Sequence, residues 1–235
     1  MKTYAKISGL FQALNELLFP RLCCACNIPL NNSETFICIS CLYQLPFTDH
    51  HLYAENKTAR KFWGRIPFHA AMALLHFRKG NRVQQLIHHL KYKGKKQLGN
   101  VLGLILAEQL RNAPLFQGID LIIPVPLHKR KEKSRGYNQS DCIAKGLSKA
   151  LNIPIASKCL IRHKATGSQT RKNRFTRFEN MKDVFLVLNP NLLSGKHILL
   201  VDDVITTGAT IEACAIALQP CGMQKLSIAA IAFAD

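Results

Sequence analysis

The stretch that decides the fold is KHILLVDDVITTGAT, residues 196–210. Its apolar run, Ile198 to Val201, predicts a buried strand. Two adjacent acids, Asp202 and Asp203, follow where that strand is expected to end. A turn containing threonine and glycine comes next, and an alanine-rich helix is predicted over residues 208–218. The segment therefore predicts a strand, a loop and a helix, with polar side chains gathered at the junction.

This junction has the chemistry of a site for a phosphorylated ribose. Backbone N–H groups of a glycine-containing turn and of a helix N-terminus bind phosphate oxygens. A carboxylate accepts hydrogen bonds from sugar hydroxyls or binds hydrated Mg²⁺. The alternative is that the two acids only form a turn and a helix cap. We expect the ribose or Mg²⁺ at Asp202 and Asp203, and the 5-phosphate at Thr206, Thr207, Gly208, Ala209 and Thr210.

Apolar strands and helical patterns alternate along most of the chain. This alternation predicts a parallel sheet covered by helices on both faces, with ligands bound beyond the carboxyl ends of the strands. Residues 46–67 have no clear periodicity and are expected to form a linker or a mobile edge. Further strands are predicted at 71–77, 119–125, 153–161, 184–188 and 226–233, helices at 82–91, 97–111 and 138–151, and a basic loop at 127–136.

Cysteines are concentrated near the N-terminus, where five of the nine lie between residues 23 and 41. Cys23 with Cys26, and Cys38 with Cys41, form two C-x-x-C pairs, an arrangement that suits tetrahedral Zn²⁺. A disulfide pair or plain buried cysteines are the alternatives. The surrounding segment has few apolar residues, so bound metal would supply its folding free energy. Four thiolates leave no open position, and the site is therefore predicted to be structural.

Basic residues exceed acidic ones, 32 to 14, for a formal net charge of +18. This excess favours a nucleic acid as partner, with general solubility as the alternative. The amphipathic stretch 7–19 is too short to cross a bilayer, no later segment is long enough, and a cytoplasmic protein is expected. The predicted nucleic-acid contacts are Lys91, Lys93, Lys95, Lys96, Arg171, Arg174 and Arg177.

Several stretches resemble known families. Residues 196–210 resemble the motif with which type I phosphoribosyltransferases bind phosphoribosyl pyrophosphate (PRPP). Three further stretches resemble the ComF, or ComFC, family of competence proteins: LKYKG at 90–94, PVPLH at 124–128 and RGYNQ at 135–139. The four-cysteine element near the N-terminus also resembles an element that members of that family carry at the same position. Scattered matches follow at Arg162, Thr166, Gln169, Arg177 and Asn180.

The resemblance implies an N-terminal helix and zinc module over 1–45, a linker or hood over 46–96, and a type I phosphoribosyltransferase-like domain over 97–235. It also implies a pyrophosphate loop with Pro126, Arg130, Arg135 and Gly136.

The resemblance implies that this chain is a ComF-type protein of natural transformation. It would bind PRPP together with Mg²⁺, and it would also bind single-stranded DNA. Its protein partners would be a DNA-uptake helicase or recombination proteins. Two other interpretations stay open: an active phosphoribosyltransferase of nucleobase salvage, and a PRPP-binding sensor without chemistry.

Overall fold

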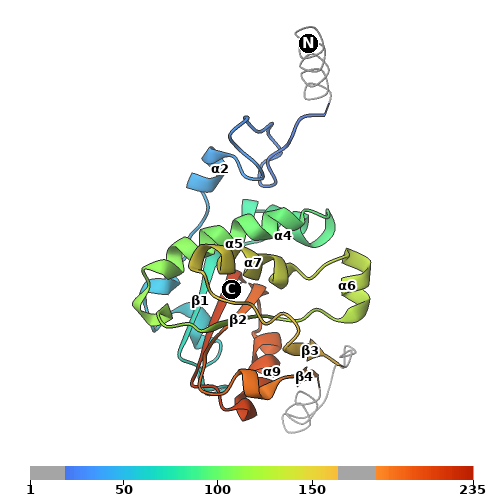
Figure 1. Ribbon diagram of the computed structural model, residues 1–235. Coiled ribbons are helices and arrows are strands. Elements are labelled where there is room, and N and C mark those ends of the chain that lie inside the picture. The colour runs from blue at the N-terminus through green and yellow to red at the C-terminus, as the bar shows by residue number, and fades with distance from the viewer. Residues whose placement is uncertain (1–18, 164–183, 235) are drawn as a thin grey trace, which may run out of the picture.

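The computed structural model describes residues 19–163 and 184–234, and its centre is a four-stranded sheet. The strand order is β1-β6-β5-β2, and every neighbouring pair is parallel (Figure 1). The predicted α/β class with a parallel sheet is therefore confirmed. The strands are β1 (Ala70–Phe77), β2 (Leu121–Pro124), β5 (His197–Ile205) and β6 (Lys225–Ala234).

Helices cover both faces of this sheet. Figure 1 shows α4 (Arg82–Tyr92), α5 (Lys96–Arg111) and α7 (Gln139–Leu151) on one side and α9 (Ala209–Leu218) on the other. Successive side chains of a strand point to opposite faces. Ile198 and Leu200 accordingly pack in the core beneath α9, whereas Leu199 and Val201 pack beneath α5 and α7. An apolar run buried on both faces is what a central parallel strand requires.

Helices α5 and α7 pack unusually closely because glycines face each other. A Cβ atom on Gly103 would lie 2.2 Å from the carbonyl oxygen of Ile143, and one on Gly146 would lie 2.1 Å from that of Asn100. Both separations are far below contact distance, so alanine at either position would force the helices apart. This packing holds α5 and α7 together where both cover the sheet.

Strand β5 is longer than predicted. The acids Asp202 and Asp203 lie within it rather than after it, and the strand continues to Ile205. The pairing with β2 ends at Val201, but β6 continues alongside, with Asp202 opposite Ala230 and Val204 opposite Ala232. The predicted strand ended too early because polar residues usually end a buried strand. Here the long neighbouring strand β6 supplies hydrogen bonds to β5 beyond Val201.

The predicted strand 153–161 is wrong. Only a bridge between Ile155 and Ile122 continues the main sheet, and β3 (Leu160–Arg162) pairs instead with β4 (Phe185–Val187). These two short strands form a separate antiparallel sheet.

Residues 46–67 contain two short helices, η1 (His50–Leu52) and α3 (Lys57–Arg60), where an irregular linker was predicted. Buried Asn56 connects them: its side-chain amide donates to the carbonyls of His50, Tyr53 and Ala71, and its Oδ1 accepts from the N–H of Ala59. Fully buried Phe62 anchors the segment on the α9 side. The domain boundaries at 45 and 96 stay a prediction.

The cysteine segment lies beyond α4 and α5, on the side away from α9 (Figure 1), and includes α2 (Ile39–Tyr43). The predicted helix at 7–19 falls almost wholly outside the described residues. Within residues 19–163 and 184–234, no helix is both long and apolar enough to cross a membrane. Three further 3-10 helices are η2 (Pro114–Phe116), η3 (Pro190–Leu192) and η4 (Gln219–Cys221).

Candidate functional site

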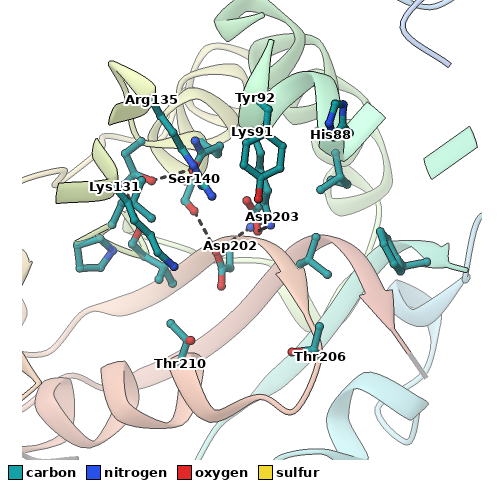
Figure 2. Close-up of a pocket in the computed structure, with 18 of the residues that line it drawn as sticks. His88, Lys91, Tyr92, Lys131, Arg135, Ser140, Asp202, Asp203, Thr206 and Thr210 are labelled. Atoms are coloured by element: carbon teal, nitrogen blue, oxygen red, sulfur yellow. Dashed lines mark hydrogen bonds and ion pairs between the residues drawn. The ribbon is translucent and has the colours of Figure 1, made fainter. Parts of the chain in front are cut away.

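A cavity of about 670 Å³ opens beyond the carboxyl ends of β2 and β5. Its floor holds Asp202 and Asp203 of β5, and Thr206 and Thr210 border it from the turn before α9 and from α9 itself (Figure 2). Residues of α4, α6 and α7 form the opposite wall. The structure thus brings the predicted acids and two of the predicted threonines to one open site.

The turn that enters α9 depends on Gly208, which has a φ of +77°. A Cβ atom there would lie 2.8 Å from Cε1 of Phe62, so both backbone conformation and space call for glycine. Arg65 holds the same turn from outside, since its Nη1 donates to the carbonyl of Thr207 at 2.9 Å and its guanidinium pairs with Glu212. Local sequence patterns contain no signal for Arg65, because its partners are distant in the chain.

The two acids have different partners. Asp202 accepts hydrogen bonds at Oδ1 from the hydroxyl of Ser140, at 3.0 Å, and from the N–H of Asp203, at 2.8 Å. Asp203 forms an ion pair with Lys91, whose Nζ lies 3.0 Å from Oδ1. Burial, helped by the charge of Asp203, raises the pKa of Asp202 to about 7 although these hydrogen bonds and Lys91 lower it. This pKa places the titration of Asp202 near neutral pH.

The opposite wall is basic, and Lys131 and Arg135 line the cavity there. Arg135 is positioned on two sides: its Nη1 donates to Oε1 of Gln139 at 2.9 Å, and its guanidinium lies 5.1 Å from the centroid of the Tyr92 ring. Gln139 is itself buried at the start of α7. The wall can therefore offer positioned cations to an anionic ligand.

The predicted loop at 127–136 is wrong in conformation, since most of it forms α6 (Lys129–Arg135). His128 caps the start, where its Nδ1 accepts from the N–H of Arg130 at 3.2 Å. Gly136 ends the helix with a φ of +77°. The prediction failed because α6 buries none of its side chains, so it has no apolar periodicity to detect.

The four predicted cysteine ligands also converge. The sulfur atoms of Cys23, Cys26, Cys38 and Cys41 all lie within 4.8 Å of one another, and Cys26 and Cys38 are 3.8 Å apart. Sulfurs about 2.3 Å from a tetrahedral Zn²⁺ would be roughly 3.8 Å apart, whereas a disulfide needs about 2 Å. The donor set and spacing therefore fit a tetrahedral metal ion.

Backbone N–H groups favour the thiolate form of Cys23, whereas burial raises the pKa of Cys26 and of Cys41. Burial raises the pKa of Cys23, but hydrogen bonds from nearby backbone N–H groups, including those of Cys38 and Ala25, outweigh it and lower the value to about 7. A thiolate is the form that binds metal.

Comparison with known proteins identifies the family. The phosphoribosyl transferase domain family matches residues 140–235. DNA utilization protein YhgH of Escherichia coli (strain K12) is 30% identical over 211 residues, which cover 83% of this chain and 89% of the relative. Competence protein F of Haemophilus influenzae is 32% identical over 147 residues, covering 61% and 64%. This chain belongs to the ComF family. Competence protein ComFC of Bacillus subtilis is 32% identical over 92 residues, covering 39% and 35%.

Family membership confirms the resemblance seen in the sequence, and the main domain is phosphoribosyltransferase-like. The ComF stretches all meet at the cavity. Leu90 accepts a hydrogen bond from the hydroxyl of Tyr137, which ties LKYKG to RGYNQ, and Asn138 donates to the carbonyl of Val125 in PVPLH, 3.0 Å away. The roles of Gln139 and Ser140 were missed, although Gln139 lies inside a stretch that carried the resemblance.

The other residues predicted for the pyrophosphate loop are divided between two cavities. Pro126 lines the large cavity, whereas Arg130 lines a second cavity beside it, and Gly136 caps α6.

The residues predicted to contact nucleic acid lie in several places. Lys91 lines both cavities. Lys93, Lys95 and Lys96 are exposed between α4 and the first turn of α5. Arg171, Arg174 and Arg177 lie outside the described residues.

Proposed function

We propose that the large cavity binds the phosphorylated ribose of PRPP. One observation carries the proposal: a carboxylate pair, a threonine turn at a helix N-terminus and a basic wall converge on one cavity. Each part has the charge that one part of PRPP needs. The ten-residue helix α9 directs its first N–H groups and positive dipole end to this turn, which favours a phosphate there.

Each group of residues then has a distinct role in binding. The hydroxyls of Thr206 and Thr210 and the amides from Thr207 to Thr210 donate to the 5-phosphate. Asp202 and Asp203 accept hydrogen bonds from the ribose hydroxyls. Lys131 and Arg135, next to Pro126, neutralise the pyrophosphate, and Arg135 can do so through two parallel N–H donors.

Mg²⁺ fits this arrangement as a partner of the ligand. The ion is commonly bound by one or two carboxylates together with substrate phosphates, and Asp202 and Asp203 are the carboxylates that would hold it. It would add positive charge beside the pyrophosphate. Since the pKa of Asp202 is raised to about 7, a nearby cation would favour its ionised form.

We further propose that the protein acts in DNA uptake and binds single-stranded DNA. Relatives named for competence and for DNA utilization support this role. The net charge of +18 supports a polyanionic partner. A DNA-uptake helicase or recombination protein would be its protein partner, and Zn²⁺ would hold the cysteine module.

Calorimetry with PRPP and Mg²⁺ tests the cavity. The double variant Asp202→Asn/Asp203→Asn should lose PRPP binding but keep its fold, because asparagine retains the shape while removing both charges. Asp141→Asn removes a carboxylate of α7 that pairs with Lys145, and should bind PRPP like the wild type. Unchanged PRPP affinity in the double variant would refute the site.

The same preparation distinguishes the alternatives. Binding of single-stranded oligonucleotides that weakens steeply with salt supports the DNA role. Release of pyrophosphate from PRPP in the presence of a free nucleobase would instead support a salvage enzyme. PRPP binding with neither property would leave a sensor.

A further inference from the structure

A second cavity of about 520 Å³ adjoins the first between the end of α4 and α6. Its lining within the described residues contains four cations and no carboxylate. Three of them, Arg130, Lys131 and Arg135, form no ion pair within the described part of the chain, and Lys91 pairs with Asp203. The full lining is Lys91, Tyr92, Gly94, Arg130, Lys131, Ser134 and Arg135.

Helix α6 presents one face to this cavity. Arg130, Lys131, Ser134 and Arg135 line it, at spacings of one, three and four residues that place them on one side of a helix. The residues between them, Glu132 and Lys133, do not line either cavity and are exposed. The basic lining is therefore a property of one helix face rather than of a uniformly charged helix.

The two cavities share four residues as their common wall: Lys91, Tyr92, Lys131 and Arg135. At this wall the Arg135 guanidinium lies over the Tyr92 ring, and the ring of His88 lies 5.2 Å from that of Tyr92, centroid to centroid. Tyr92 remains 64% exposed. An exposed aromatic ring beside cations is the combination on which single-stranded nucleic acids stack and bind.

We infer that the two cavities form one continuous site for the 5′-phosphorylated end of single-stranded DNA. The terminal 5′-phosphate lies at Thr206–Thr210, and the next phosphodiester lies in the second cavity against Arg130 and Lys131. The terminal deoxyribose has no free 2′- or 3′-hydroxyl, so it passes the acid pair without the hydrogen bonds proposed for the ribose of PRPP. This inference rests on the proposed function of the large cavity and names the end of the strand that it takes.

The size and charge of the cavities favour a strand end over PRPP alone. PRPP carries its 5-phosphate and its pyrophosphate on a single sugar. The large cavity already offers the threonine turn for the 5-phosphate and the Lys131–Arg135 wall for the pyrophosphate. The lining of the second cavity extends beyond that wall to Arg130, Ser134 and Gly94. A strand also continues from its terminal sugar through a phosphodiester, and Lys91 lines both cavities beside the acids. Its ammonium group would offset the repulsion between Asp203 and that phosphodiester.

Fluorescence anisotropy with the full chain tests the inference, using a twelve-nucleotide oligothymidylate that carries either a 5′-phosphate or a 5′-hydroxyl. We expect the 5′-phosphate to tighten binding about tenfold, as one set of charge-assisted hydrogen bonds does. Excess PRPP should abolish this advantage, because both ligands place a phosphate at the threonine turn.

Two variants of α6 separate the second cavity from general charge. Arg130→Ala should weaken oligonucleotide binding about fivefold and reduce the salt slope by about 0.7, as expected for one lost phosphate contact to a single strand. Its PRPP affinity should stay within about twofold of wild type, because Arg130 does not line the large cavity. Lys133→Ala removes the same charge from the other face and should change oligonucleotide affinity less than about twofold.

Four outcomes would overturn the inference. If the 5′-phosphate has no effect, the strand end does not enter the threonine turn. If Arg130→Ala and Lys133→Ala behave alike, the second cavity does not hold the strand. In either case PRPP binding by wild type would leave the proposed function intact. If Arg130→Ala weakens PRPP as strongly as the oligonucleotide, the second cavity belongs to the PRPP site. If wild type binds neither ligand, the proposed function falls as well.

Discussion

The Nζ atom of Lys91 lies 3.0 Å from Oδ1 of Asp203, which connects α4 to the carboxyl end of β5. Both side chains are largely enclosed, with 22% and 11% of their surface exposed. An enclosed ion pair loses much more when one partner is removed than an exposed pair does. Lys91 therefore stabilises the site as well as lining both cavities, and Asp202 is left as the acid without a cation at hydrogen-bonding distance in the described residues.

Asp202 should make the protein less stable as pH rises from about 4 to about 7. Its pKa is raised to about 7 in the folded protein, chiefly by burial, against an ordinary value of 3.8. Between these two values the folded state holds the proton more tightly than the unfolded chain, so the free energy of unfolding falls with rising pH. Asp202→Asn should remove this dependence and stabilise the protein at pH 8 by on the order of 1 kcal/mol, measured by urea denaturation.

The control for this prediction is Asp141→Asn, which changes another partly buried carboxylate, the one that pairs with Lys145 on α7. Its unfolding free energy should follow the same pH dependence as the wild type. If Asp202→Asn keeps the wild-type dependence too, Asp202 is ionised throughout this pH range.

Gly208→Ala should destabilise the protein and weaken PRPP binding together. A left-handed backbone at a non-glycine residue costs about 1–2 kcal/mol, and here the new methyl group would also meet Phe62 at 2.8 Å. We expect a loss of roughly 2–4 kcal/mol by denaturant unfolding, and a shifted turn that binds phosphate at least tenfold more weakly.

Gly195→Ala is the matched control for Gly208→Ala, because Gly195 also has a left-handed backbone, with a φ of +69°, but nothing lies within 4 Å of the added Cβ atom. It should show the backbone cost alone, about 1–2 kcal/mol, with normal PRPP affinity. Equal losses in the two variants would mean that Phe62 moves aside.

The features that the sequence predicted well are those encoded in a few neighbouring residues. The turn at Thr206–Thr210 and the two C-x-x-C pairs each combine several constraints in a short stretch, and the structure brings each set together. The end of β5 could not be predicted locally, because it depends on hydrogen bonds from β6. Helix α6 was missed since it has no buried face, and Ser140 was missed because its partner, Asp202, is distant in the chain.

Arg65 is the clearest residue that only the folded structure identifies, and Arg65→Ala should affect binding more than stability. Its ion pair with Glu212 is open to solvent on the Arg65 side, where screening limits such pairs to less than about 1 kcal/mol. Its hydrogen bond to the carbonyl of Thr207, however, holds the turn at Thr206–Thr210, where we propose that the 5-phosphate binds. We expect PRPP affinity to fall roughly threefold to tenfold by calorimetry, with the unfolding free energy lowered by less than about 1 kcal/mol.

Arg60→Ala is the comparison, because Arg60 lies on neighbouring α3 and its guanidinium stacks over Trp63, 5.8 Å from the ring centroid. It removes the same charge without touching the turn, and PRPP affinity should not change. A similar loss in both variants would assign the effect to long-range charge.

Cys38→Ser should release the metal and loosen the N-terminal module without disturbing the parallel sheet. Besides its place in the sulfur cluster, the Sγ of Cys38 accepts the N–H of Cys41 at the start of α2. A serine hydroxyl can still cap that helix, so the substitution removes the sulfur ligand alone. Metal binding to such cysteine sets is worth on the order of 10 kcal/mol, which the few apolar residues of this segment cannot replace. Elemental analysis should fall from about one zinc per chain to almost none. Hydrogen exchange should accelerate at residues 23–43 but not in β5 or β6.

Cys24→Ala is the control for Cys38→Ser. It alters a buried thiol outside the cluster and should keep its zinc. A wild-type protein that is purified without metal, yet protects residues 23–43 from exchange, would contradict the zinc assignment.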